Sequence, residues 1–249
     1  MRLTEDVYLV GGSPSVGFGL SGEIDSHVYC IDGGGELALI DCGMAAGDSM
    51  ERIFANLRED RLDPARIGSL FVTHYHTDHA GGAAAFRERL GLKVGISHEG
   101  AQTLRTADGY WTGLDRAKQA GFYAADYVYT PCPVDRELHD GEQVRIGELT
   151  LTMYETPGHC NGHGCYLLQG RTRRYLFTGD CVFFGGEILL QNIPDCDIQR
   201  YATSIAKLAE LEYEAFLPGH MAICLSNGTQ HVRAAQAQFS KMFLPKQLI

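Results

Sequence analysis

The segment His74-Tyr75-His76-Thr77-Asp78-His79 decides how this chain is interpreted, because it places four metal-ligand side chains within six residues. Residues 69–72 before it are apolar and β-prone, whereas residues 80–90 begin with two glycines and continue with helical spacing. The segment is therefore predicted to be a loop between a strand and a helix. In such a loop the four side chains can converge on one point, whereas on a strand they would alternate between faces.

The ligand types in this segment predict more than one metal ion. Imidazole nitrogen and carboxylate oxygen suit Zn²⁺, and also Fe or Mn, and three histidines with one aspartate exceed the needs of one tetrahedral ion. Further ligand side chains each follow an apolar, strand-like run and stand beside a glycine. They are His159 in Thr156-Pro157-Gly158-His159, Asp180 in Thr178-Gly179-Asp180 and His220 in Pro218-Gly219-His220.

In this order, the four elements resemble the metallo-β-lactamase superfamily, whose members show H-x-H-x-D-H, a TPGH-like histidine, a GD pair and a PGH-like histidine. The resemblance spans nearly the whole chain. It implies a single α/β domain over residues 1–249, folded as a four-layer αβ/βα sandwich. It also implies two metal ions, one held by His74, His76 and His159 and the other by Asp78, His79 and His220, with Asp180 bridging them.

Such a pair of ions predicts hydrolysis. Two divalent ions about 3.5–4 Å apart can share a hydroxide, because their combined charge lowers the pKa of water toward neutrality. Asp78 or Asp180 would orient this hydroxide or relay its proton. We therefore expect a dinuclear hydrolase, with zinc as the favoured metal and Fe or Mn as alternatives. Its substrate would be a small molecule with an ester-like bond, namely a lactone, a thioester or an ester.

Two residues are expected close behind the ligands. Asp41, in Ile40-Asp41-Cys42-Gly43, lies in a segment similar to the family's "IDTG". The resemblance implies that it holds a ligand histidine by its free ring N–H, and a turn or helix-cap aspartate is the alternative. His163 stands four residues after His159 and is expected in the pocket or against a ligand, since the seven ligands already fill both metal sites.

Three segments could shape the substrate pocket. Phe183 and Phe184 follow the bridging aspartate closely, the glycine- and serine-rich stretch 11–25 carries Phe18, and residues 108–111 include the only tryptophan. Aromatic side chains there would favour an apolar or acyl-bearing substrate, although each segment could equally pack in the core. Acyl-homoserine lactonases resemble this chain in length and ligand set, yet they carry a tyrosine where Phe183 stands.

The composition of the chain indicates which kinds of partner are not expected. A net charge of −10 argues against a nucleic-acid substrate, and the basic stretch 171–174 is expected to be a solvated hairpin turn. The absence of a long apolar stretch and of a leader-like start predicts a cytoplasmic protein without a membrane partner.

Eight cysteines without C-x-x-C spacing are expected to be reduced, and Cys160 and Cys181, each beside a ligand, are expected to point away from the metals. The oligomeric state is left open, a homodimer included.

Three other functions stay open at this point. A diiron oxidoreductase and a non-catalytic, metal-containing ligand-binding protein could share the ligand set, and a phosphodiesterase or nuclease is a minor alternative. The predicted elements do not separate them. Strands are expected at 7–10, 28–31, 37–40, 93–97, 143–146, 149–154, 166–169 and 175–178, and helices at 48–59, 99–121, 198–212 and 229–243.

Overall fold

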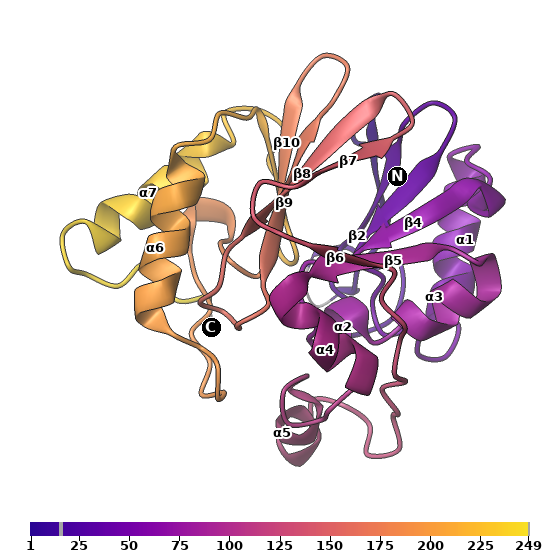
Figure 1. Ribbon diagram of the computed structural model, residues 1–249, viewed down its shortest axis with the longest axis horizontal. Helices are drawn as coiled ribbons and strands as arrows, with labels where there is room; N and C mark the ends of the chain where they lie inside the picture. The colour runs from indigo at the N-terminus through magenta and orange to yellow at the C-terminus, as the bar shows by residue number, and fades with distance from the viewer. Residues whose placement is uncertain (15–16, 249) are drawn as a thin grey trace.

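Two β-sheets face each other in the computed structural model, which describes residues 1–14 and 17–248 (Figure 1). The first sheet has the order β1(Val7–Gly11), β2(Val28–Asp32), β3(Leu37–Ile40), β4(Ile67–Phe71), β5(Lys93–Ser97), β6(Arg136–Leu138). The second has the order β11(Ala215–Pro218), β10(Arg174–Gly179), β9(Gly164–Gln169), β8(Leu149–Glu155), β7(Gln143–Ile146). The helices are α1(Ser49–Glu59), α2(Thr77–Ala80), α3(Ala83–Leu90), α4(His98–Thr106), α5(Leu114–Gln119), α6(Ile198–Ala209) and α7(Thr229–Phe239).

Strand alternation explains why both faces of the first sheet are apolar. In β2, Tyr29 and Ile31 enter the core between the sheets, whereas Val28 and Cys30 pack toward helices α1, α3 and α4. Tyr29 meets Phe177 of the second sheet edge to face, with 5.3 Å between ring centroids. Helices α6 and α7 cover the outer face of the second sheet (Figure 1). These four layers confirm the predicted αβ/βα sandwich.

The structure corrects several expected boundaries. The helix expected over 99–121 is wrong, because α4 ends at Thr106, Ala107 adopts a left-handed conformation, and Gly113 (φ 75°) precedes the separate helix α5. The helices expected to reach residues 212 and 243 end at Ala209 and Phe239, respectively. Of the metal segment, residues 77–79 belong to the short helix α2 rather than to a loop.

Two other features bear on the sequence expectations. The three-residue edge strand β6 was not predicted, since so short a run carries no recognisable alternation. The basic stretch 171–174 does turn between β9 and β10, with the Gly170 N–H donating to the Arg173 carbonyl over 3.0 Å. None of the helices in the described ranges is both long and apolar enough to cross a lipid bilayer.

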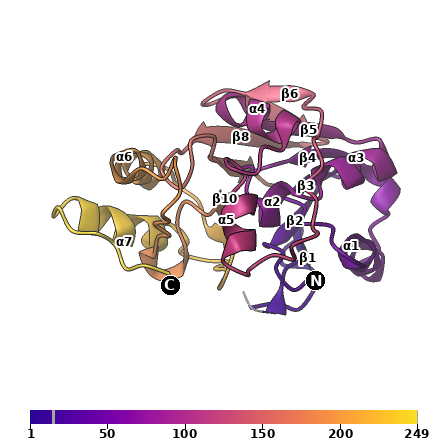
Figure 2. The same cartoon turned by 90° about the horizontal axis from the view of Figure 1, so that it is seen from below.

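The ends of four strands from both sheets gather at one edge of the sandwich. The segments that follow β4, β8, β10 and β11 carry His74, His159, Asp180 and His220, respectively. Carboxyl ends of parallel strands meet at one edge, and β10 and β11 are such a parallel pair. Helices α2 and α5 lie on this same edge, which Figure 2 shows from below. The fold therefore brings distant parts of the sequence into one site.

Candidate metal centre

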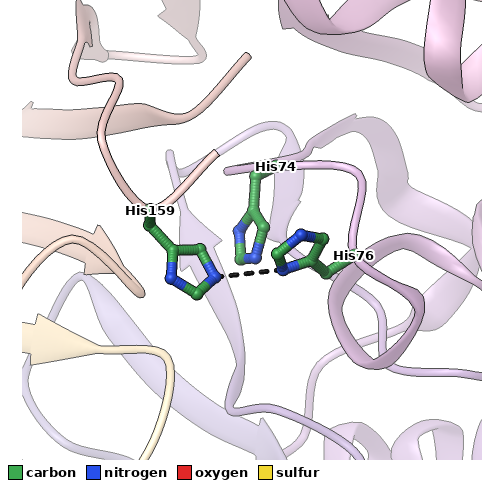
Figure 3. Close-up of side chains that lie close together, drawn as sticks. All are labelled: His74, His76 and His159. Carbon is green, nitrogen blue, oxygen red and sulfur yellow. Dashed lines mark hydrogen bonds between the residues drawn. The ribbon is translucent and has the colours of Figure 1, made fainter. Parts of the chain in front are cut away.

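The structure brings all seven expected metal ligands together. Their donor atoms form three overlapping groups, and within each group the donors lie within 4.8 Å of one another. The groups are His74, His76 and His159; His74, His79 and Asp180; and Asp78, His79 and His220. Figure 3 shows the first group, in which the three rings converge and His159 Nε2 lies 3.0 Å from His76 Nδ1.

Asp180 lies between the first and the last group. Its Oδ1 is 3.2 Å from His79 Nε2 and 3.4 Å from His220 Nε2, and its Oδ2 is 3.7 Å from His159 Nε2. His220 Nε2 is also 3.2 Å from Asp78 Oδ2. Each carboxylate oxygen of Asp180 therefore faces a different set of imidazole nitrogens, which is the arrangement a bridging ligand needs.

Asp41 and Thr73 fix which ring nitrogen of two histidines faces the centre. Asp41 Oδ2 accepts hydrogen bonds from Thr73 Oγ1 (2.8 Å) and His79 Nδ1 (2.9 Å), and Asp41 Oδ1 accepts from the Thr73 N–H (2.7 Å). Since the Thr73 hydroxyl donates to Asp41, it accepts from His74 Nδ1 over 3.0 Å. His74, whose pKa is lowered by burial, therefore turns an unprotonated Nε2 toward the centre. His79 also turns its Nε2 there. Burial opposes its charged form, but the carboxylates of Asp180 and Asp78 raise its pKa, so a metal ion would have to replace the proton on this nitrogen.

His163 and two glycines complete the support of Asp180. The Asp180 N–H donates to His163 Nε2 over 3.1 Å, and His163 Nδ1 lies 2.9 Å from the Thr156 hydroxyl. A Cβ atom at Gly219 would lie 2.6 Å from Asp180 Oδ1, and one at Gly179 would lie 2.8 Å from His163 Nε2. Glycine is thus needed beside both ligands because the chain packs too closely for a side chain.

The electrostatics of the site fit a bound cation. Burial lowers the pKa of His76 to about 3, so that its imidazole is neutral near pH 7. Burial also opposes the charged form of His220, but the carboxylates of Asp180 and Asp78 outweigh it and raise the pKa to about 9. His74 Nε2 is buried and has no hydrogen-bond partner among the described residues. A metal ion would both satisfy this nitrogen and replace the proton between the carboxylates and His220.

Tyr123 is a neighbour of the centre that sequence reasoning missed. Its hydroxyl donates to Asp78 Oδ1 over 3.2 Å, while the other oxygen of Asp78 faces His220. The residue lies in the irregular stretch between α5 and β6, 45 residues after Asp78. No spacing in the sequence could have signalled this contact, because only the course of the chain after α5 creates it.

The thiols beside the ligands take no part in the metal groups of the described residues. Cys160 and Cys181 are buried and free, and neither belongs to any of the three groups. A hydrogen bond with Cys165 and burial raise the pKa of the Cys181 thiol well above its ordinary value. A protonated, buried thiol is a poor metal ligand.

Replacing Cys181 with serine is expected to leave the metal content unchanged. The sulfur contacts Cys165 rather than a metal group, so the substitution removes only a buried hydrogen-bond partner. Elemental analysis of Cys181→Ser and of the unmodified protein, purified side by side, measures the effect. Loss of one metal equivalent in the variant would instead make the thiol a ligand.

An apolar pocket of about 590 Å³ has a wall that includes Met221, the residue after His220. Phe18, Phe183 and Phe184 all line it, as expected for the segments that carry them. Residues 15 and 16, in the stretch 11–25 that carries Phe18, lie outside the described residues. The expectation for residues 108–111 is wrong for this pocket, since Tyr110 and Trp111 are exposed near α5 and pack against each other.

Known proteins resemble this chain over most of its length. The human "Acyl-coenzyme A thioesterase MBLAC2" is 28% identical over 211 residues, which cover 78% of this chain and 72% of that protein. The "Atrochrysone carboxyl ACP thioesterase" of Aspergillus fumigatus is 27% identical over 227 residues, which cover 91% of this chain but only 59% of that protein. This chain thus spans about three-fifths of the length of the fungal relative.

Solved structures share the fold at low sequence identity. A metallo-β-lactamase from Cronobacter sakazakii superposes with a TM-score of 0.74 at 20% identity, over 97% of this chain and 96% of that one. At this identity the likeness establishes the fold alone. The model of the "Metallo-beta-lactamase superfamily" matches residues 21–220, which include all seven ligand positions. The chain therefore belongs to the metallo-β-lactamase superfamily.

Proposed function

We propose that this protein hydrolyses acyl thioesters at a pair of divalent metal ions. The reaction class predicted from the sequence, a metal-dependent hydrolase, is confirmed by the family match and by the thioesterases that resemble this chain. The single observation that carries the dinuclear proposal is the position of Asp180, whose two oxygens face two different groups of ligands. The two relatives described above are both named thioesterases, and this favours a thioester over a lactone or a simple ester.

The proposed ligand assignment follows the observed groups. His74, His76 and His159 would hold one ion, Asp78, His79 and His220 the other, and Asp180 would bridge them. Zinc fits the nitrogen-rich donor set best, with Fe or Mn as alternatives. Two cations bound there would supply Lewis acidity for the thioester carbonyl and an acidified water as nucleophile.

A carboxylate of the chain would then transfer the proton of the attacking water. Asp78 is the most open of the ligands, with 17% of its side chain exposed, whereas Asp180 is almost fully buried. Asp78 is therefore placed to accept a proton from the attacking water and pass it to the departing thiolate. The eight free cysteines favour a reducing compartment, so that a cytoplasmic location is part of this proposal.

A substrate panel tests the function directly. The protein is stripped of metal, reloaded separately with Zn²⁺, Mn²⁺ or Fe²⁺, and given acyl-coenzyme A thioesters, lactones, aryl esters and phosphodiesters. We expect thioester cleavage with two bound ions per chain, and loss of this activity after chelation. Cleavage of lactones alone would overturn the substrate class, and two bound irons without any cleavage would instead support an oxidoreductase.

Replacing Tyr123 with phenylalanine is expected to weaken the metal group that contains Asp78. The substitution removes the hydrogen bond that orients the free oxygen of this carboxylate, and loss of such a support typically lowers metal affinity about 10-fold or more. Chelator competition measures the affinity of each ion. Tyr127→Phe is the matched control, because its hydroxyl donates to the Met44 carbonyl and not to a ligand. Equal affinities in both variants would contradict the role of Tyr123.

A further inference from the structure

We infer that the pocket lined by Phe18, Phe183, Phe184, Met221 and Leu248 binds the acyl chain of the substrate and gives the enzyme a preference for medium or long chains. The inference rests on the proposed thioesterase function and says where the acyl half of the substrate lies. The volume of the pocket, about 590 Å³, lies in the range of about 300–1,000 Å³ that is usual for drug-sized ligands. An acetyl group would leave most of this space empty.

Two residues of the pocket wall are neighbours of the proposed metal ligands. Met221 follows His220 in the chain, and the ring of Phe183 lies against that of His220 with 6.3 Å between centroids. Phe183 comes three residues after Asp180 and is fully buried. Phe183 and Met221 thus connect the loops of the ligands to the pocket wall, and an acyl group whose carbonyl lay at the metals would pass these two residues to enter the pocket.

The opposite wall is tied to the same metal loops. The segment that carries Phe18 ends at Ser26 and His27, whose N–H groups donate to the carbonyls of Asp78 (3.1 Å) and Gly219 (2.7 Å). The ring of Phe18 packs edge to face on His27 with 5.4 Å between centroids. The apolar wall is thus held at a fixed place relative to both metal loops, which favours a defined binding site over a chance surface hollow.

The chemistry of the lining selects an apolar occupant. Glu187 is the only charged side chain among the lining residues that the structure describes, and it is ion-paired with Lys246. Phe184 is 44% exposed, although its ring packs on His231 with 4.3 Å between centroids. A large aromatic ring left half open in a pocket wall gains free energy when an alkyl chain covers it. The pantetheine half of a coenzyme A thioester, with its amides and hydroxyl, would find few hydrogen-bond partners here.

A chain-length series tests this assignment. Acetyl-, butyryl-, hexanoyl-, decanoyl- and palmitoyl-coenzyme A are compared by kcat/KM with the metal-loaded protein. Burial of each methylene is worth up to about fourfold, so we expect kcat/KM to rise with chain length until the pocket is full. Cleavage that is independent of chain length would overturn the acyl pocket and leave the thioesterase proposal standing.

Two substitutions place the preference in this pocket. Ala222→Trp fills the pocket from an exposed lining position, and displacement of only two methylenes corresponds to about a 15-fold loss for decanoyl-coenzyme A. The quantity that tests the pocket is therefore the ratio of kcat/KM for decanoyl- to that for acetyl-coenzyme A, which should fall in this variant. Ala237→Trp, at an exposed position on α7 outside the lining, is the matched control. Equal losses with every acyl chain would place the thiol half of the substrate here and overturn the inference.

A second pair of variants tests the pocket in case the tryptophan variants do not fold. Phe184→Asp puts a charge on the half-exposed wall and should lower the ratio of kcat/KM for decanoyl- to that for acetyl-coenzyme A, whereas Phe122→Asp, 70% exposed and outside the lining, should leave this ratio unchanged. Calorimetric binding of free decanoate to the same proteins tests the pocket even if no thioester is cleaved. Decanoate binding that Phe184→Asp abolishes would support it, and binding that neither variant changes would refute it.

Discussion

Replacing Asp180 with alanine is expected to lower hydrolysis about a thousandfold or more and to reduce the metal content of the purified protein. The carboxylate faces His79 and His220 with one oxygen and His159 with the other. Without it, two cations would sit close together with no anion between them, and their repulsion would expel or separate them. A thousandfold loss corresponds to about 4 kcal/mol in the activation free energy.

Two further variants separate the loss of a bridge from the loss of a buried carboxylate. Asp6 is fully buried and paired with Arg171, in the hairpin that joins β9 and β10. We expect Asp6→Ala to destabilise the fold but to retain both metals, as read by thermal denaturation and elemental analysis. Asp180→Asn keeps the shape and loses the charge, so it should resemble the alanine variant in metal content. An Asp180→Ala protein with two metals and normal turnover would refute the bridging role.

The seven side chains that converge in the candidate metal centre could be singled out from the sequence, because they lie in segments with a recognisable local signal. The segments that carry them follow apolar strands, and three of the ligands stand beside glycines such as Gly219, where the structure leaves no space for a Cβ atom. The strands could be predicted for a similar reason, since residues such as Tyr29 and Cys30 alternate between the two core layers. Both signals depend on neighbours in the chain.

The remaining parts of the site depend on contacts between distant segments, which a single sequence does not record. Thr73 matters only because Asp41 and His74 approach it from either side. Leu248 reaches the pocket because the backbone around it pairs with Ile188. The error over residues 99–121 has a local cause instead, since helical spacing outweighed the turn signal of Asp108-Gly109 in that prediction.

Replacing Asp41 with asparagine is expected to weaken the metal group that contains His79 by about 10- to 100-fold. The Asp41 carboxylate accepts three hydrogen bonds, two from Thr73 and one from His79 Nδ1. An asparagine side chain has one acceptor oxygen, and its NH₂ group would face a donor wherever it points. Either His79 loses its acceptor or its ring takes the other tautomer, which would turn an N–H toward the metal.

Asparagine is chosen because it can adopt the same backbone conformation as Asp41, so that the substitution changes only the side chain. Asp41 adopts a left-handed conformation with φ 57°, which asparagine tolerates far better than most residues. The metal-free variant should also be about 1–3 kcal/mol less stable, the usual cost of an unmade buried hydrogen bond. Thermal denaturation of the metal-free protein and chelator competition of the loaded protein measure the two effects separately.

Asp25 offers the matched control. It is buried, and its carboxylate accepts hydrogen bonds from Ser21, Ser49 and the Met44 N–H without touching any of the seven ligands. Asp25→Asn should therefore lower stability by a similar amount and leave metal affinity unchanged. If Asp41→Asn bound both metals as tightly as this control, Asp41 would be a structural aspartate of the turn after β3. Weaker binding in Asp41→Asn alone would make it the residue that orients the His79 ring toward the metal group.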